Sequence, residues 1–238
     1  MTTQQLSHFE LVGEFHYVFG HPLRSKPYIQ CFDDEKLINL RKALIVEEYD
    51  EFKAAFETHN VCEMVDALAD LIYVVNGCGH ALGINLDFML WLSGMDVSTS
   101  IDEVEHVTVE NLLPLTTFIQ TNSEFINQHI QMLGLYFENK NLQKAAQQLV
   151  QILYYAYKLG HGIGFNMDVI FREVHRANMN KTCPTVEDAQ ASVEFYIKDG
   201  RYKNPTFKQK NSYYVVYSGD GKILKNHKWT PPDIAKYV

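Results

Sequence analysis

The chain has 238 residues, 46% of them hydrophobic and 21% charged, and its formal net charge is −8 with histidine neutral. That length can bury one substantial core, and the composition excludes a disordered, collagen-like or low-complexity chain. The acidic balance argues against a broad nucleic-acid surface, and no apolar run approaches the roughly 18 residues of a membrane span. Residues 1–10 lack a secretory signal pattern, and the four scattered cysteines are typical of a reducing compartment. We expect a soluble, cytoplasmic protein with neither nucleic-acid nor membrane partners.

Helical periodicity of the apolar residues extends over most of the chain and predicts an all-α fold. Helices are expected at about 6–19, 37–57, 61–81, 117–138, 142–161, 166–180 and 186–198. Beyond Gly200 the pattern changes, because residues 213–217 and 222–225 flank the turn-forming stretch 218–221. This arrangement predicts a small C-terminal β-hairpin followed by an irregular tail.

An internal repeat underlies the helical part. The stretch that begins Gly79-His80 returns at Gly160-His161, 81 positions later, and an Asn and an Asp again follow in register. We interpret this as a tandem two-helix repeat that forms a four-helix core, with repeat one at about 37–92 and repeat two at about 118–173. Residues 1–181 would then make one all-α domain, on which a C-terminal helix, the hairpin and the tail (182–238) pack.

Repeat one carries carboxylates on both of its helices. At about 100° per residue, Glu48 and Glu51 fall on the face of Leu40 and Leu44, and Glu47 falls at its edge. Carboxylates on a core-facing stripe are costly unless a cation compensates them. We expect no Lys or Arg on this stripe, so a metal ion is the natural compensation.

The next helix places Glu63, Asp66 and Asp70 one above another. Alone, these three would suit the wet face of an amphipathic helix. Packed antiparallel against the first helix, they would complete a group that we call the acidic cluster: Glu47, Glu48, Glu51, Glu63, Asp66 and Asp70. A site made only of carboxylate oxygens favours Mg²⁺, with Mn²⁺ as a substitute.

Repeat two offers an internal comparison, because none of its equivalent positions is acidic. In the order of the acidic cluster, they hold Gln128, His129, Met132, Lys144, Gln147 and Gln151. The apolar skeleton and the Gly-His turn are nevertheless kept. The fold therefore does not need the acids, which indicates that they serve one chemical site.

The carboxylates resemble those of the all-α NTP pyrophosphatase superfamily, the MazG-like group that includes the dimeric dUTPases. Its E-E-x-x-E signature is similar to Glu47-Glu48-x-x-Glu51, and Asp70 looks like the last residue of its E-x-x-D. Ala67 stands three positions before Asp70, where the family has Glu. Either Asp66 substitutes from one position away, or the stretch from residue 63 to residue 66 is the functional pair.

Other stretches extend the resemblance over most of the chain. They are E-F-H-x-x-F-G at 14–20, E-V-H-R-A-N-M-N-K at 173–181, G-K-x-L-K at 221–225 and W-x-P-x-D at 229–233. The resemblance implies hydrolysis of dUTP or another nucleoside triphosphate to monophosphate and pyrophosphate, which would clear unwanted nucleotides. The acidic cluster would hold Mg²⁺, and Glu47 or Glu48 would accept a proton from the attacking water.

The same motifs imply substrate contacts, and each has a plainer alternative. Asn178 and Lys181 would bind the nucleotide, or would belong to a solvated face. His16 and Phe19 would wall the base pocket, or would be core side chains. Three residues of the tail would close over phosphates or base, or would be structural: Lys222, Lys225 and Trp229.

Repeat two could replace the second subunit with which family members form their core, giving a monomer (an internal pseudo-dimer) or a homodimer. A different reading is a catalytically inactive nucleotide-binding or scaffold protein of the same fold. A prenyl-type synthase fits poorly, because no D-D-x-x-D lies on a helix face. Zinc is disfavoured by the irregular spacing of the residues that could bind it, which are His59, Cys62, Cys78 and His80.

Overall fold

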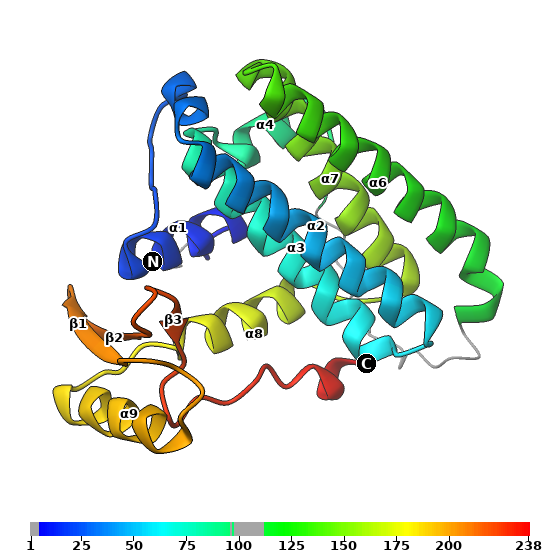
Figure 1. Cartoon of the computed structure of the whole chain (residues 1–238). Helices are drawn as coiled ribbons and strands as arrows, with labels where there is room; N and C mark the ends of the chain where they lie inside the picture. Colours follow the sequence, from blue (N-terminus) through cyan, green and yellow to red (C-terminus); the bar gives the residue numbers. More distant parts are fainter. Residues whose placement is uncertain (1–4, 96, 98–111) are drawn as a thin grey trace.

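The computed structural model describes residues 5–95, 97 and 112–238, which form a helical protein with a small C-terminal sheet (Figure 1). The helices are α1 (His8–Phe19), α2 (Glu35–Glu57), α3 (Val61–Leu82), α4 (Leu86–Leu92), α6 (Thr116–Glu138), α7 (Leu142–Ile163), α8 (Met167–Met179) and α9 (Val186–Asp199). Short 3-10 helices are η1 (Ile29–Asp33), η2 (Leu113–Leu115) and η3 (Ile234–Tyr237), and the strands are β1 (Thr206–Lys210), β2 (Tyr213–Tyr217) and β3 (Ile223–Leu224). The predicted all-α class with a small β element is confirmed.

The β element is larger than the predicted hairpin. β2 pairs antiparallel with β3 at the predicted place, and it also pairs with β1 along its other edge. β1 reads Thr-Phe-Lys-Gln-Lys and is mostly exposed. A polar edge strand lacks the apolar alternation that identifies a strand in sequence, which is why the prediction missed it.

α2, α3, α6 and α7 form the central bundle (Figure 1). α2 packs on α3, α6 packs on α7, and α3 contacts α7 across the middle. The apolar faces of the four helices share one buried core, whose fully enclosed side chains include Phe52, Leu68 and Ile126. Burial of this core is the main source of the bundle's stability.

The two halves of the bundle have matching boundaries. α6 and α7 begin and end 81 residues after α2 and α3, and α8 begins 81 residues after α4. The Oδ1 atoms of Asn60 and Asn141 cap α3 and α7 by accepting the N–H three residues on, at 3.2 and 3.0 Å. Both helices end at a left-handed glycine, Gly83 or Gly164. The period read from the sequence is therefore also the period of the backbone.

The buried face of α2 is rotated from the predicted one. Leu40 is 50% exposed, whereas Ile45 and Phe52 are fully buried. The acids thus follow the edge of the core face rather than its centre. The expectation that this stripe carries no cation is also wrong, because the buried Arg41 precedes Glu48 by two turns on the same face.

Within residues 182–238, α9 and the sheet share a small apolar cluster around Tyr196 and Val216. This segment packs against the helical part at two places. Val215 of β2 joins Val18 and Phe19 of α1 in another apolar cluster, and η3 contacts α3 and α8. The end of the chain therefore returns to the bundle (Figure 1).

Among the described helices, none alone is both long and apolar enough to cross a membrane. α3 and α4 together reach that length and composition, but the chain bends by 100° between them.

Candidate active site

The acidic cluster gathers where α2 and α3 run side by side. Glu48, Asp66 and Asp70 are half-buried, and the other three carboxylates, Glu47, Glu51 and Glu63, are exposed beside them. The antiparallel turn after α2 sets this register, because it places the acids in the second half of α2 opposite those in the first half of α3. The backbone thus brings the carboxylates of the two helices close to one another.

Burial and repulsion between carboxylates raise the pKa values of the three half-buried acids. Burial first, and then the carboxylates of Asp70, Glu51, Glu47 and Asp66 in that order of importance, together raise the pKa of Glu48 to about 8. Burial and, after it, neighbouring acids likewise raise the pKa of Asp70 to about 7 and that of Asp66 to about 6. A cluster that resists ionisation near neutral pH gains from any cation that enters it.

The donor set fits a hard divalent cation. All six groups offer oxygen, and the enclosed Oδ1 of Asp66 has no hydrogen-bond partner among the described residues. No three of the His, Cys, Asp and Glu side chains in the described ranges are already arranged around a common metal position. Ligand distances would therefore require side-chain rotation, which the exposed Glu51 and Glu63 can make.

Asn178 and Lys181 reach the acidic cluster from the end of α8. The Lys181 ammonium donates to Asn178 Oδ1 at 2.6 Å. Burial lowers the pKa of Lys181, and the charges of Asp70 and Glu48 oppose that shift. Of the two residues predicted as substrate contacts, Lys181 thus lies within electrostatic reach of the acids, and Asn178 is hydrogen-bonded to it.

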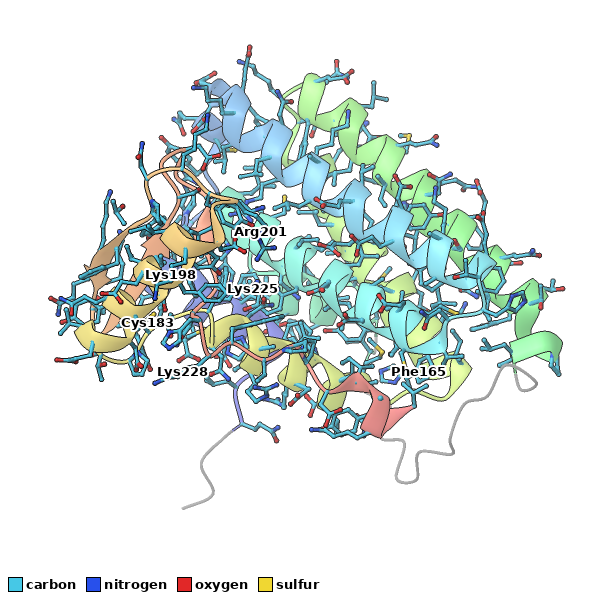
Figure 2. The ribbon with its side chains drawn as sticks, turned by 60° about the horizontal axis from the view of Figure 1, so that its bottom comes forward. Phe165, Cys183, Lys198, Arg201, Lys225 and Lys228 are labelled. Atoms are coloured by element: carbon cyan, nitrogen blue, oxygen red, sulfur yellow. The ribbon has the colours of Figure 1, made fainter. Side chains whose placement is uncertain are left out.

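The tail adds a second cation. Lys225 lies over the ring of Trp229 at 3.3 Å, and Trp229 Nε1 donates to the Ala177 carbonyl at 2.7 Å. The charge of Lys225 also acts on Lys181, and Figure 2 places Lys225 where the C-terminal segment meets the bundle. Lys222 instead lies over Tyr202, 5.7 Å away, so it is the tail residue least engaged with the bundle.

His16 and Phe19 are packed side chains. His16 is 2% exposed, its Nδ1 pairs with the Pro22 carbonyl at 2.7 Å, and burial lowers its pKa to about 3. Phe19 is buried against Val18 and Val215. Phe19 is therefore a core side chain. His16 is also buried, and it lies beside the buried cation Arg41.

A hydrogen-bonded network beside Asp70 was not foreseen. The Tyr73 hydroxyl lies 3.1 Å from His175 Nδ1, and His175 Nε2 lies 3.5 Å from a Glu14 oxygen. Tyr73 follows Asp70 by one turn, and Asp70 helps to raise its pKa after burial. Two features of the sequence could have indicated this network: Tyr73 lies one helical turn after Asp70, and Glu14 and His175 belong to the family-like motifs.

Repeat two has a cavity where repeat one has its acids. This cavity of about 600 Å³ is lined by Gln128, His129, Gln147 and Gln151, with Phe125 and Tyr155. His129, the counterpart of Glu48, pairs with Gln148 at 2.8 Å. None of the residues that line this cavity is acidic, so the equivalent place offers amides and rings instead of metal ligands.

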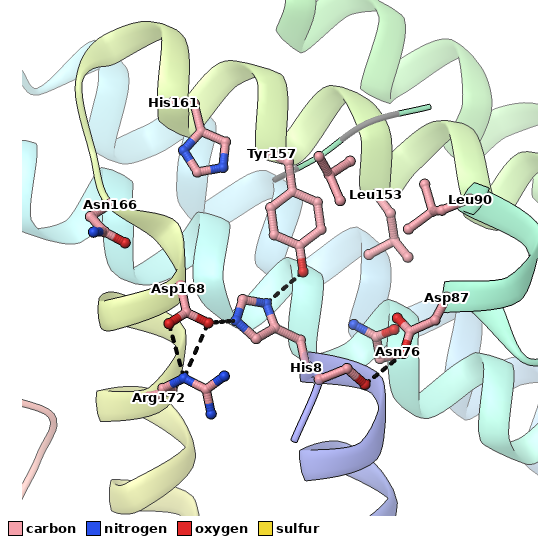
Figure 3. Close-up of a pocket in the computed structure, with 12 residues that line it drawn as sticks. His8, Asn76, Asp87, Leu90, Leu153, Tyr157, His161, Asn166, Asp168 and Arg172 are labelled. Atoms are coloured by element: carbon pink, nitrogen blue, oxygen red, sulfur yellow. Dashed lines mark hydrogen bonds and ion pairs between the residues drawn. The ribbon is translucent and has the colours of Figure 1, made fainter. Parts of the chain in front are cut away.

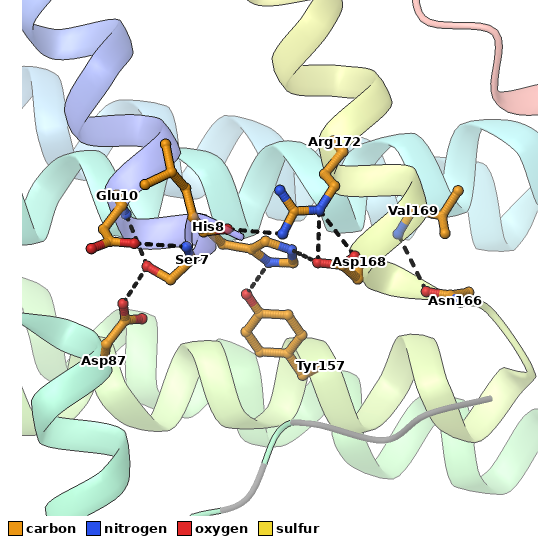
Figure 4. Close-up of polar contacts among 10 residues, drawn as sticks. Ser7, His8, Glu10, Asp87, Tyr157, Asn166, Asp168, Val169 and Arg172 are labelled. Atoms are coloured by element: carbon orange, nitrogen blue, oxygen red, sulfur yellow. Dashed lines mark hydrogen bonds and ion pairs between the residues drawn. The ribbon is translucent and has the colours of Figure 1, made fainter. Parts of the chain in front are cut away.

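A further cavity of about 460 Å³ lies beside the start of α1 (Figure 3). His8 pairs with the Tyr157 hydroxyl at 2.6 Å and with Asp168 at 2.9 Å, while the Ser7 hydroxyl donates to Asp87 at 2.5 Å (Figure 4). Asp87 and Asp168 are equivalent residues of the two repeats. These contacts fasten α1 to both repeats and involve no member of the acidic cluster.

Comparison with known proteins supports the family. The phosphoribosyl-ATP pyrophosphohydrolase family matches residues 12–90, a range that contains the whole acidic cluster. An uncharacterised protein of Acanthamoeba polyphaga mimivirus is 30% identical over 245 residues, which cover 98% of this chain and 96% of that relative. No solved structure matches. Residues 12–90 therefore carry a domain of the phosphoribosyl-ATP pyrophosphohydrolase family, which is a member of the MazG-like all-α NTP pyrophosphohydrolase superfamily.

Proposed function

We propose that the protein is a Mg²⁺-dependent nucleoside triphosphate pyrophosphohydrolase. It would convert dUTP or another (deoxy)nucleoside triphosphate to monophosphate and pyrophosphate, and so remove unwanted nucleotides. The observation that carries this proposal is the acidic cluster, whose raised pKa values call for a cation, inside the segment that matches the family. Mn²⁺ is expected to substitute.

The chain's own residues divide the work. Magnesium bound by the acidic cluster would neutralise phosphate oxygens and orient water for in-line attack. Glu48 has the raised basicity suited to accepting the water's proton, and the exposed Glu47 is the alternative. Lys181 and Lys225 offset the remaining phosphate charge, and the amide of Asn178 orients the substrate.

We infer that repeat two arose by duplication and replaces a second subunit. The shared 81-residue period and the non-acidic cavity of repeat two support this. Each chain, as a monomer or within a homodimer, would then have one active site. A metal titration followed by pyrophosphate release is expected to give one catalytic site per chain; two equivalent catalytic sites per chain would contradict the inference.

Pyrophosphate release from a panel of nucleotides with Mg²⁺ tests the function directly. Wild type is expected to turn over at least one nucleotide, and Glu48→Gln to lose that activity. Glu57→Gln is the matched control, because Glu57 is exposed at the end of the same helix. The inactive nucleotide-binding alternative is favoured by the lack of a preformed three-ligand group in the described ranges; it predicts nucleotide binding without pyrophosphate.

A further inference from the structure

Arg41 is a buried cation that has no partner among the residues that the structure describes. The residue is 6% exposed, and its Nε atom is fully enclosed. Across the described part of the chain, its guanidinium makes no hydrogen bond and no ion pair. Leaving a buried charge uncompensated is expensive, so such a group in a binding protein is a candidate for contact with a ligand.

The surroundings of Arg41 supply no anion. Burial lowers its pKa, and the titratable groups that act on it are Cys78 and Arg24. Burial raises the pKa of the Cys78 thiol to about 12, so this thiol is neutral at pH 7. Arg24 has its own partners, because it donates to the Ala81 carbonyl and stacks on Tyr28 at 4.4 Å. The neighbouring His16 and His21 have pKa values of about 3 and 4, lowered first by burial and then by Arg41, so both are neutral at pH 7.

Gly77 on α3 makes room for this arrangement. A Cβ atom at Gly77 would lie 3.0 Å from both Arg41 Nη1 and His16 Nε2. Gly77 follows Asp70 by seven residues, just as Arg41 precedes Glu48 by seven on the antiparallel α2. Both spacings are two helical turns, or about 10.5 Å along the axis.

Arg41 therefore lies on the same face as the acids, at a distance comparable with the span from phosphate to base across a nucleotide sugar. Leu44 and Val74 occupy the intermediate turn and are only half-buried. Lys181 and Lys225 are on the side of the acids, where a triphosphate would need them. The phosphates and Arg41 would thus take opposite ends of one substrate.

Aromatic rings crowd the Arg41 end. The Phe15 ring centroid lies 4.3 Å from Phe19, 5.5 Å from His21 and 5.5 Å from Tyr73. The rings of His16 and His21 are 5.4 Å apart. Flat rings beside a guanidinium suit a planar base better than a phosphate.

We propose that Arg41 hydrogen-bonds a carbonyl oxygen of the substrate base and makes the enzyme selective for bases that carry one at that position. This rests on the proposed function. A guanidinium has five N–H donors and no acceptor, so it pairs with a carbonyl oxygen and opposes an amino group. The ligand class is thereby a triphosphate of an oxo-base, with an amino-edged base disfavoured.

Two matched pairs of nucleotides test this. dITP and dATP differ by a carbonyl and an amino group on the purine, and dUTP and dCTP differ likewise on the pyrimidine. In at least one pair, kcat/KM of wild type is expected to favour the carbonyl partner on the order of tenfold. Arg41→Met is expected to reduce that preference to about threefold or less.

Gly77→Ala is the second variant, because its methyl group would crowd Arg41 and His16 without adding a charge. It should also weaken the preference, and it keeps the test decisive if Arg41→Met does not fold. Arg41→Met itself is expected to retain the thermal stability of wild type, because the charge it removes has no partner in the described part of the chain.

Binding of the same four nucleotides to Glu48→Gln separates the two proposals. If no nucleotide is turned over by wild type, the proposed function fails, while the ratios of dissociation constants still test Arg41. The inference is overturned if wild type treats both members of each pair alike. It is equally overturned if Arg41→Met and Gly77→Ala lower the kcat/KM or the affinity for all four nucleotides by one common factor.

Discussion

The ammonium of Lys181 and the carboxyl of Asp70, which are 111 positions apart in sequence, act on each other across the junction of α8 and α3. Lys181 opposes the upward shift of the Asp70 pKa, and Asp70 opposes the downward shift of the Lys181 pKa. This pair links the motif after α8 to the acids of repeat one. Lys181 and the acidic cluster are therefore parts of one electrostatic unit.

Lys181→Met should impair both halves of that unit. The KM for the nucleotide is expected to rise on the order of tenfold, because a charge-assisted contact to phosphate is lost. Without the ammonium, the pKa of Asp70 should rise further, so Mg²⁺ binding should require a higher pH. Steady-state kinetics and a metal titration at several pH values measure both effects.

Lys198→Met is the control for this variant, because Lys198 is exposed on α9 (Figure 2). It should leave KM and the pH dependence unchanged. Equal effects of the two variants would show that Lys181 acts only through overall charge.

Glu48→Gln should stabilise the metal-free protein. The pKa of Glu48 rises from an ordinary 4.5 to about 8 on folding, so between these pH values the folded state binds more protons than the unfolded state. The free energy of unfolding therefore falls as pH rises through this window, and the variant escapes the loss. At pH 8.5 without metal, we expect a gain of about 2 kcal/mol, which disappears near pH 4.5.

Urea unfolding in the presence of a chelator measures this difference. With Mg²⁺ present, wild type should be more stable to unfolding than Glu48→Gln, because only wild type has the full set of metal-binding carboxylates. A variant that is less stable than wild type at pH 8.5 would mean that Glu48 is already compensated within the fold.

Mg²⁺ binding should release protons. At pH 7 the metal-free cluster retains most of a proton on Glu48 and part of one on Asp70, and ligation requires both carboxylates. We expect about one proton released per metal at pH 7, little release at pH 9, and weaker binding as pH falls from 8 to 6. Calorimetry in buffers of different ionisation enthalpy reads the proton count, and heats that are independent of the buffer would contradict it.

Gly83→Ala should destabilise the fold strongly. Gly83 ends α3 with φ +73°, and a Cβ there would lie 1.8 Å from the Lys26 carbonyl oxygen. The segment before η1 packs on this end of α3, since the Tyr28 N–H donates to the Leu82 carbonyl at 3.0 Å. We expect a loss of about 3 kcal/mol or more in the free energy of unfolding.

Gly94→Ala is the matched control for the backbone alone. Gly94 has φ +65°, but among the described residues beyond its chain neighbours no atom lies within 4 Å of its added Cβ. A loss of about 1 kcal/mol is expected from the left-handed backbone. Similar losses in the two variants would show that the clash with the Lys26 carbonyl oxygen does not contribute to the loss in Gly83→Ala.

The described helices other than α4, which the sequence analysis did not predict, were predictable because their apolar periodicity and their caps agree. The Asn caps and glycine ends of α3 and α7 repeat at a fixed offset, so the predicted boundaries fall within two residues of those observed. Leu40 shows the limit of this reasoning, because which flank of an apolar stripe turns to solvent depends on neighbouring helices. β1 was missed because its polar residues carry no periodic signal.

The acids of the candidate site were predictable from spacing, whereas their electrostatic environment was not. Two turns of helix put Glu48 and Arg41 on one face whatever surrounds them. Arg41 is buried with no partner in the described ranges, and Lys181 acts on Asp70; both facts depend on contacts between segments far apart in the chain. Patterns within one helix cannot encode such contacts.

The most direct test of a metal-dependent pyrophosphohydrolase is the identity of the products formed from a nucleoside triphosphate, resolved by phosphorus NMR with Mg²⁺ and with chelator. The account predicts nucleoside monophosphate and pyrophosphate with Mg²⁺, nothing with chelator, and nothing from Glu48→Gln. Formation of nucleoside diphosphate and inorganic phosphate, or equal turnover by Glu48→Gln, would contradict it.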